Sequence, residues 1–413
     1  MVEKRPISFI AWEPAGTLGH PLSNLDGERD ASGPAASSSE PPRQEGGAQG
    51  TPQASPVPNI LPFPPDFYRG RARARRAALV VAVLFVGSLA FLAEVHLVDL
   101  NTLLGPHVAR SEWAFTMSGA RDLNALGWTG RGITVCLVDS GIDLLHPDFA
   151  RLRLVAWKDL VNNKSEAYDD NGHGTSMAGL IAANGSLRGI APDVSLVVVK
   201  VTNATGFGYA RVAAEGIRFC LNPFGDGTRG ADLISVSLGS SAPLFVDTEV
   251  SVAAQEALNR GVIVVAAAGN DGGPFDDGDV EIPANVPLAI GVGAVDASGR
   301  IAPFSSSSFV NRTDPNRKPE IVGPGVQIIS TAPGAHYLTL SGTSPATAVT
   351  AGVVALLLQA HPDLRPAGST ANVLALKWAL IGFRAPGPGY ALPHDPWYGY
   401  GLLDGKRALA YLS

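Results

Sequence analysis

The sequence contains little cysteine, little charge and no excess of basic residues. Two cysteines in 413 residues exclude a disulfide-rich scaffold. Charged residues make up only 16% of the chain and the net charge is -6, so we expect no nucleic-acid partner. Hydrophobic residues make up 46%, which is typical of a tightly packed α/β domain and argues against disorder over most of the length.

The two cysteines, Cys136 and Cys220, each lie in an apolar run, which favours a role in buried packing. Neither has a cluster of positive charge beside it in the sequence, so neither is predicted to be a reactive thiolate. The sequence leaves open whether the two residues form a disulfide.

Residues 1–68 are rich in Pro, Gly, Ser and Ala and have no sustained apolar period. Such a segment cannot bury enough surface to offset its ordering entropy, so we expect a disordered tail. One short apolar patch, Ile7 to Trp12, is either a docking motif or an incidental run.

A cluster of five arginines then precedes an uncharged apolar run, Ala77 to Ala93. At about 1.5 Å per residue this run alone spans about 25 Å, which is short of a hydrocarbon core of about 30 Å. Extension to Val98 makes it long enough. We therefore predict a basic flank and a transmembrane signal anchor over residues 69–98, with residues 77–98 in contact with the lipid bilayer.

The arginine cluster predicts the orientation of this single-pass segment. Basic residues stay on the cytoplasmic side, so we expect a cytoplasmic N-terminus and a periplasmic or extracellular domain, joined to the anchor by a linker over residues 99–110. The alternative is a signal sequence that is cleaved at the small residues of Ser88-Leu89-Ala90, which would release a secreted protein.

Residues 111–413 alternate between short β-branched runs and helical segments. The predicted buried strands are Ile133 to Val138, Val194 to Val201, Leu233 to Leu238, Val262 to Ala267 and Leu288 to Val292. The predicted helices are His173 to Ala183, Gly208 to Leu221, Asp247 to Asn259 and Ser344 to Ala360. This alternation predicts a three-layer α/β fold, in which helices cover both faces of a parallel sheet and chemistry collects at the carboxyl ends of the strands.

Three polar residues stand at the ends of these predicted elements. Asp139 ends the first strand, and His173 lies between two glycines at the head of a helix. Ser344 is placed as the N-cap of the last helix, with Pro345 at the first helical position. A serine hydroxyl needs a base to remove its proton, and an imidazole needs a carboxylate to fix its tautomer, so these residues can form a catalytic triad. Taken alone, Asp139 is equally well interpreted as a capping residue, and a lone Ser344 is better interpreted as one.

A fourth residue adds a donor at the same edge. The strand GVIVVAAAGN ends in Asn270, which places an amide where a developing oxyanion could be held.

These segments closely resemble those of the subtilisin-like serine peptidases. The matching motifs, in the order that the family has them, are Asp139-Ser140-Gly141, His173-Gly174-Thr175 and Gly342-Thr343-Ser344. The resemblance implies a serine endopeptidase in which Ser344 is the nucleophile, His173 the general base and Asp139 its orienting carboxylate, and the predicted anchor would tether it to the membrane. It also implies that Asn270 holds the oxyanion.

The resemblance further implies where a peptide substrate binds. An extended substrate is expected to pair as an added strand with a segment whose contacting residues are Ser235, Ser237, Leu238 and Gly239. The main specificity pocket is expected to be lined by Ala266, Ala267, Ala268 and Gly269. Small uncharged walls predict a preference for an apolar side chain before the scissile bond.

No cofactor is required for this chemistry, although many members of the family bind structural calcium. Asp276, Asp277 and Asp279 are either an oxygen cluster for such an ion or a solvated acidic loop. Two other functions are weighed. A catalytically inactive subtilase fold that serves as a membrane-tethered binding module is the alternative to the peptidase. A dinucleotide-binding enzyme is disfavoured, because Gly127, Gly130 and Gly132 precede the first strand, whereas a phosphate-binding loop must follow it.

Overall fold

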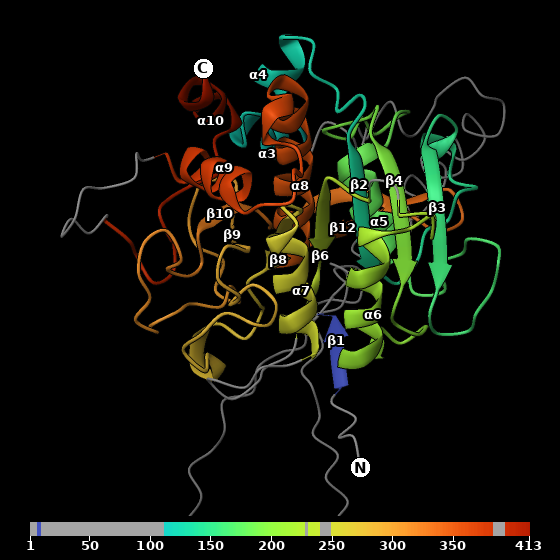
Figure 1. The fold of residues 1–413 in the computed structure, drawn as a ribbon, viewed down its shortest axis with the longest axis horizontal. Coiled ribbons are helices and arrows are strands. Elements are labelled where there is room, and N and C mark those ends of the chain that lie inside the picture. Colours follow the sequence, from blue (N-terminus) through green and yellow to red (C-terminus); the bar gives the residue numbers. More distant parts are fainter. Residues whose placement is uncertain (1–5, 10–110, 228–229, 240–248, 383–392) are drawn as a thin grey trace, which may run out of the picture. The chain divides into compact units, whose positions relative to one another are not determined.

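A seven-stranded, all-parallel sheet forms the centre of the computed structural model (Figure 1). The structure describes residues 6–9, 111–227, 230–239, 249–382 and 393–413, and the predicted anchor over 69–98 lies outside them. The strand order is β10-β9-β8-β6-β2-β4-β3. In chain order the strands are β2 (Thr134–Asp139), β3 (Arg153–Asp159), β4 (Ser195–Lys200), β6 (Leu233–Val236), β8 (Ile263–Ala267), β9 (Ile290–Val295) and β10 (Ile321–Pro324).

All five predicted strands are confirmed, with ends that differ by a few residues. The two that the sequence did not predict, β3 and β10, lie at the edges of the sheet. Most side chains of β3 are only half-buried, so its sequence, RLVAWKD, lacks the continuous apolar run of a strand covered on both faces.

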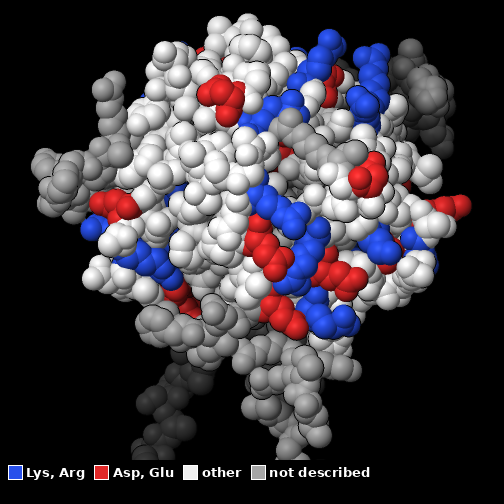
Figure 2. All heavy atoms as spheres, in the orientation of Figure 1, with Lys and Arg blue, Asp and Glu red and all other residues white. Residues whose placement is uncertain are grey.

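Helices cover both faces of the sheet, as predicted (Figure 1). On one face, α6 (Ala210–Leu221) and α7 (Glu249–Asn259) pack against each other and against β2, β4 and β8. On the other, α5 (His173–Ala182) packs against α8 (Thr343–Ala360), which contacts β6, β8, β9 and β10. Figure 2 shows that basic and acidic side chains are mixed over the α6 and α7 face, where Arg218 pairs with Glu256 at 2.8 Å.

Helix α8 is the central helix of the core. Its small and aliphatic side chains are buried from Thr343 to Leu358, which lets neighbouring elements approach it from every side. Among the described residues it is the one helix long and apolar enough to cross a membrane, but 89% of it is buried inside the fold. It therefore serves as a core helix and gives only weak support for a membrane span.

Smaller elements pack around α8 and α5. The helices are α3 (Glu112–Met117), α4 (Ala120–Ala125), α9 (Ala371–Ile381) and α10 (Gly405–Leu412). The antiparallel pair β11 (Ile328–Ala332) and β12 (His336–Leu340) contacts α5 through β11. Three short 3₁₀ helices complete the described elements, at Pro147–Phe149, Gly273–Phe275 and Pro362–Leu364.

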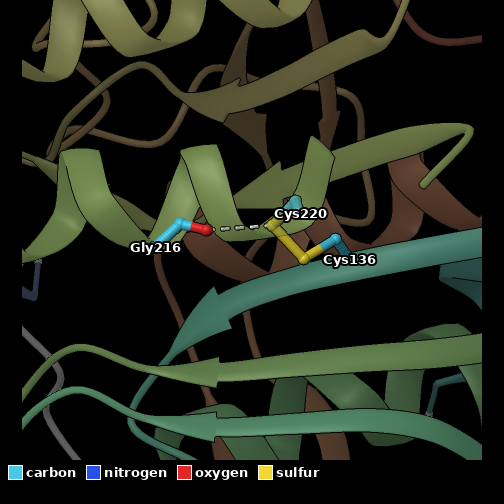
Figure 3. The surroundings of a disulfide bond; sticks show 3 residues. All are labelled: Cys136, Gly216 and Cys220. Atoms are coloured by element: carbon cyan, nitrogen blue, oxygen red, sulfur yellow. Dashed lines mark hydrogen bonds between the residues drawn. A yellow bond between two sulfur atoms is a disulfide. The ribbon is translucent and has the colours of Figure 1, made fainter. Parts of the chain in front are cut away.

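A disulfide joins β2 to α6 between Cys136 and Cys220 (Figure 3). Both residues are fully buried, so the predicted packing role is confirmed, and the pairing that the sequence left open is formed. Cys136 and Asp139 lie on opposite faces of β2 because side chains alternate along a strand. The bridge therefore reaches α6 without disturbing the face on which α5 lies.

A separate three-stranded antiparallel sheet contains the N-terminal strand β1 (Pro6–Phe9). It lies between β5 (Phe207–Tyr209) and β7 (Leu238–Gly239), with Ile7 opposite Gly208 and Ser8 opposite Gly239. The prediction that the whole of residues 1–68 is disordered was therefore wrong for these four residues. The β-compatible patch from Ile7 onward pairs with two strand edges that would otherwise be open.

Candidate active site

Two of the polar residues predicted to act together lie where strands end at the same edge of the sheet. Asp139 is the last residue of β2, and Asn270 follows the end of β8. The carboxyl ends of parallel strands share an edge. His173 and Ser344 belong instead to α5 and α8, two helices that pack against each other. The fold thus gathers residues that are far apart in the chain.

Asp139 and His173 are brought into direct contact. His173 Nδ1 lies 2.8 Å from Asp139 Oδ1, and the two side chains are 2% and 0% exposed. The same carboxylate oxygen accepts a hydrogen bond from the Ser140 backbone N–H at 2.7 Å. An imidazole held in this way presents Nε2 as its second ring nitrogen, so the contact fixes both its tautomer and its orientation.

The glycines around His173 allow this close approach. Gly172 has a φ of 101°, a left-handed conformation that glycine adopts without strain. A Cβ atom on Gly174 would collide with the carbonyl oxygen of Gly141, in the loop after β2. The head of α5 can therefore touch the end of β2 because Gly174 lacks a side chain.

Ser140 and Asp169 support His173, although the sequence analysis did not single them out as functional residues. Ser140 Oγ donates to Asp169 Oδ1 at 2.8 Å and accepts from the Gly174 N–H at 2.9 Å. The other oxygen of Asp169 accepts from the Thr175 N–H at 2.9 Å. Their signal in the sequence is position: Ser140 lies inside the motif of Asp139, and Asp169 lies four residues before His173.

Ser344 lies in the first turn of α8, and its side chain is 2% exposed. The helix begins at Thr343 with Gly342 as its N-cap, so the prediction that Ser344 is the N-cap was wrong. Gly342 supplies the extended backbone before the helix, and Ser344 is the second residue of the helix. Ser344 Oγ contacts the Ser237 carbonyl oxygen at 3.4 Å, and its hydroxyl lies at the positive end of the helix dipole.

Asn270 is tied to the same turn. Its Oδ1 accepts hydrogen bonds from the Thr343 N–H at 2.9 Å and from the Thr343 hydroxyl at 3.0 Å. A Cβ atom on Gly342 would lie 3.1 Å from Asn270 Nδ2. Thr343 thus orients the amide so that its donor nitrogen borders the turn that leads into Ser344.

The comparison with known families adds to this geometry. A family model described as the subtilase family matches residues 130–377, which includes Asp139, His173, Asn270 and Ser344. The chain belongs to the subtilase family.

Individual subtilases are similar to this chain over the same region. The serine protease AprX of Bacillus subtilis (strain 168) is 38% identical over 267 residues, which cover 58% of this chain and 59% of AprX. Subtilisin E of the same organism is 37% identical over 244 residues, with 58% of this chain and 59% of that protein covered. M-protease of Shouchella clausii (strain KSM-K16) is 37% identical over 254 residues, with shares of 61% and 60%. The match therefore spans about 60% of the length of these relatives.

The segment expected to bind substrate in this subtilase borders Ser344. The main chain of Ser237 contacts Ser344, and Leu238 and Gly239 form β7, which pairs with β1. Ser235 lies within β6, which pairs with β2 on one side and β8 on the other, so the expectation that a substrate strand pairs with Ser235 was wrong. The Ser237 side chain is fully buried. The expected pocket residues Ala266, Ala267, Ala268 and Gly269 are also buried, at the end of β8 and directly before Asn270.

The acidic loop after Asn270 uses its carboxylates within the protein. Asp279 pairs with Arg312, whose Nη2 lies 2.5 Å from Oδ2. Asp276 accepts a hydrogen bond from the Ser307 hydroxyl at 2.6 Å. Across the residues that the structure describes, no group of three or more His, Cys, Asp or Glu side chains is arranged to hold a metal ion. Asp279 is buried and only Asp277 is exposed, so the three residues are not one solvated acidic loop. Binding of structural calcium stays a prediction.

Proposed function

We propose that this subtilase is a serine endopeptidase that cleaves peptide bonds through an acyl-enzyme. The observation that carries the proposal is the buried 2.8 Å contact between His173 Nδ1 and Asp139 Oδ1. A carboxylate in this position stabilises the imidazolium that forms when Nε2 takes up a proton. The chain order Asp, His, Ser is also that of the catalytic triad of subtilisin.

In the proposed mechanism, Ser344 Oγ attacks the carbonyl carbon of the scissile bond while His173 Nε2 accepts the hydroxyl proton. The imidazolium then donates that proton to the leaving amine, and the C–N bond breaks to give an ester on Ser344. Water attacks the ester with His173 again acting as base, and the acid product leaves. Asp139 remains ionised throughout and holds His173 Nδ1.

Negative charge develops on the carbonyl oxygen during both steps. We propose that the Asn270 amide and the Ser344 backbone N–H donate to it. The orientation of Asn270 by Thr343 supports this assignment, because its Oδ1 is already engaged and its Nδ2 borders the turn. Donors that are fixed before the reaction stabilise a transition state more than donors that must first be reoriented.

The proposed substrate is a protein or peptide bound in extended form between β5 and β7. Strand β1 occupies this position and shows that the two edges are spaced to accept an antiparallel strand. Main-chain hydrogen bonds of this kind give affinity without dependence on sequence, so selectivity must come from side-chain pockets.

We also propose that the catalytic domain lies outside the cytoplasm, anchored in the bilayer through residues 77–98. The Cys136–Cys220 disulfide supports export, because disulfides persist in oxidising compartments and are rare in the cytosol. A single crossing would separate residues 6–9 from the domain, whereas β1 pairs with β5 only when both lie on the same side. A single crossing and the pairing of β1 with β5 therefore cannot both occur in one molecule.

The activity is tested by labelling intact cells with a fluorophosphonate probe, with and without a membrane-impermeant competitor. We expect one labelled serine that is protected by the competitor and absent from the Ser344→Ala variant. Absence of labelling in folded, disulfide-bonded protein would favour the inactive binding module. Labelling seen only after lysis would contradict export.

The topology is tested separately with an epitope tag placed before residue 6. Protection of the tag from added protease in intact cells supports the single crossing, and exposure of the tag supports pairing of β1 with the domain. Recovery of the domain in the medium without the tag would support the cleaved signal sequence.

A further inference from the structure

A carboxylate that the proposed mechanism does not use lies beside Asn270. The Glu281 backbone N–H donates to the Ala268 carbonyl at 2.7 Å, so the loop after β8 folds back along the end of that strand. A Cβ atom on Gly269 would lie 2.9 Å from Glu281 Cγ. The Glu281 side chain therefore passes directly over Gly269, one residue before the predicted oxyanion donor.

The surroundings of Glu281 disfavour its ionised form. Burial raises the pKa of Glu281 to about 8, and the neighbouring carboxylates Asp271 and Asp277 raise it further. The residue retains partial contact with solvent. Within the described part of the chain, no hydrogen-bond donor or cation contacts its carboxylate oxygens.

Nearby carboxylates each have a partner. Asp279 pairs with Arg312, Asp276 accepts from Ser307, and Asp271 accepts from the Ser306 hydroxyl. The Ser306 hydroxyl also lies against Gly269, but it donates to Asp271 and leaves Glu281 without a bond. Glu281 is thus an acidic group at the edge of the site for which the described protein supplies no counter-charge.

The position of Glu281 relates it to one part of a substrate. The carbonyl held by Asn270 belongs to the residue before the scissile bond, so the side chain of that residue starts next to Asn270. Ala268 and Gly269 have no side chain larger than a methyl group, and the side chains of Glu281 and Ser306 lie against Gly269. A long substrate side chain that reaches Gly269 would therefore meet Glu281.

We propose that Glu281 determines specificity by pairing with a basic side chain, Lys or Arg, on the residue before the scissile bond. This inference rests on the proposed peptidase function. It revises the expectation of an apolar preference, which considered only the small walls and not the acidic residue that folds over them. A charged hydrogen bond in a partly desolvated site discriminates strongly, because loss of either partner leaves the other unpaired.

The test uses four acyl-Ala-Ala-Pro-X p-nitroanilides in which X is Arg, Lys, norleucine or Phe. The concentration of active enzyme is set by titration with the fluorophosphonate probe. At pH 9, above the raised pKa of Glu281, we expect the natural enzyme to prefer Arg or Lys over norleucine in kcat/KM. In Glu281→Gln, kcat/KM for Arg and Lys should fall by about 10- to 100-fold, with norleucine changed by less than about threefold.

Asp277→Asn is the matched control. It removes a nearby negative charge from the same loop while keeping the oxygen that accepts from the Asp279 N–H. We expect it to change the Arg to norleucine ratio by less than about threefold, because an exposed charge is screened by solvent. The rate of probe labelling reports whether each variant retains a folded site.

The outcomes separate the two proposals. A preference for Phe or norleucine in the natural enzyme, or an equal loss for all four substrates in Glu281→Gln, would overturn the role of Glu281 and leave the peptidase function intact. No hydrolysis of any substrate, together with no probe labelling, would overturn both.

Discussion

Two glutamates that the fold removes largely from water have opposite surroundings. Glu320 precedes β10, is fully buried, and places Oε1 2.8 Å from Lys318 Nζ and 2.7 Å from Lys377 Nζ. Its other oxygen accepts from the Gly291 N–H at 2.7 Å. Glu281 is buried less completely, yet it has no such partner among the described residues.

The difference separates a structural role from a proposed binding role. Glu320 has its counter-charges within the fold, so its removal should affect folding and leave substrate choice unchanged. Glu281 lies next to Asn270 and lacks a counter-charge, so its removal should affect substrate choice and leave folding almost unchanged. The predictions below test this separation.

The largest expected effect concerns the proposed nucleophile Ser344, because selectivity at Glu281 can be measured only if the enzyme cleaves its substrates. Ser344→Ala should lower kcat by about 10⁶, the magnitude found when the catalytic serine of subtilisin is removed. Hydrolysis of the preferred anilide per mole of folded protein measures the change. Ser341→Ala, three residues earlier in the chain, is the control. A Ser344→Ala variant that keeps more than a few per cent of the activity would exclude Ser344 as the nucleophile.

The Glu320 side of the comparison is tested by Glu320→Gln. Two buried lysines would then lack their carboxylate, so the free energy of unfolding should fall by about 3–5 kcal/mol in urea denaturation. Burial lowers the pKa of Lys318 to about 7, so the folded state binds fewer protons than the unfolded state above that pH. The stability of the variant should therefore rise as the pH increases from about 7 towards 10.

Glu256→Gln is the matched control for this variant, because Glu256 pairs with Arg218 on the surface. Its expected loss is below about 1 kcal/mol. Equal losses in the two variants would show that the buried cluster has no special importance for the fold.

Asn270→Ala should lower kcat by about 10²–10³, the magnitude found for the corresponding donor in subtilisin. The reduction should be the same for Arg and norleucine substrates, because the oxyanion does not depend on the side chain. This result would sharpen the contrast with Glu281→Gln, in which kcat/KM should fall only for substrates with a basic side chain. Full activity in Asn270→Ala would remove the oxyanion assignment.

The smallest expected effect is a pH dependence of selectivity. Burial raises the pKa of Glu281 to about 8, so the carboxylate is mostly protonated at pH 7 and ionised at pH 9. The ratio of kcat/KM for Arg over norleucine should rise about tenfold between these pH values, and His173 affects both substrates equally. A flat ratio in the natural enzyme would contradict the pairing, whereas a flat ratio is expected for Glu281→Gln.

The sequence was sufficient to predict the central strands and the helices that cover them. Those elements have continuous apolar runs or clear helical periods, which reflect burial on both faces or along one side. Edge strand β3 mixes charged and apolar residues because one side is open, so its pattern is weaker. The glycines beside His173 marked the site, because Gly172 has a positive φ and a side chain on Gly174 would collide with the Gly141 carbonyl.

The contacts that depend on the folded chain were not predictable. Cys136 and Cys220 look like ordinary core residues until β2 and α6 lie together. Glu281 belongs to an acidic loop in the sequence, and only the hydrogen bond from its N–H to Ala268 brings it over Gly269. The pairing of β1 likewise joins residues about 200 positions apart, a distance over which local patterns carry no information.

The Cys136–Cys220 bridge closes a covalent loop that contains Asp139 and His173 but not Ser344. A single backbone cut within residues 137–219 would therefore leave both halves linked until a reductant is added. A cut between residues 221 and 343 has no such link, and denaturation would release the nucleophile on a separate fragment from its base. Molecules cut within residues 137–219 can refold as one covalent unit. In molecules cut between residues 221 and 343, the two fragments must reassociate in solution before the site can form.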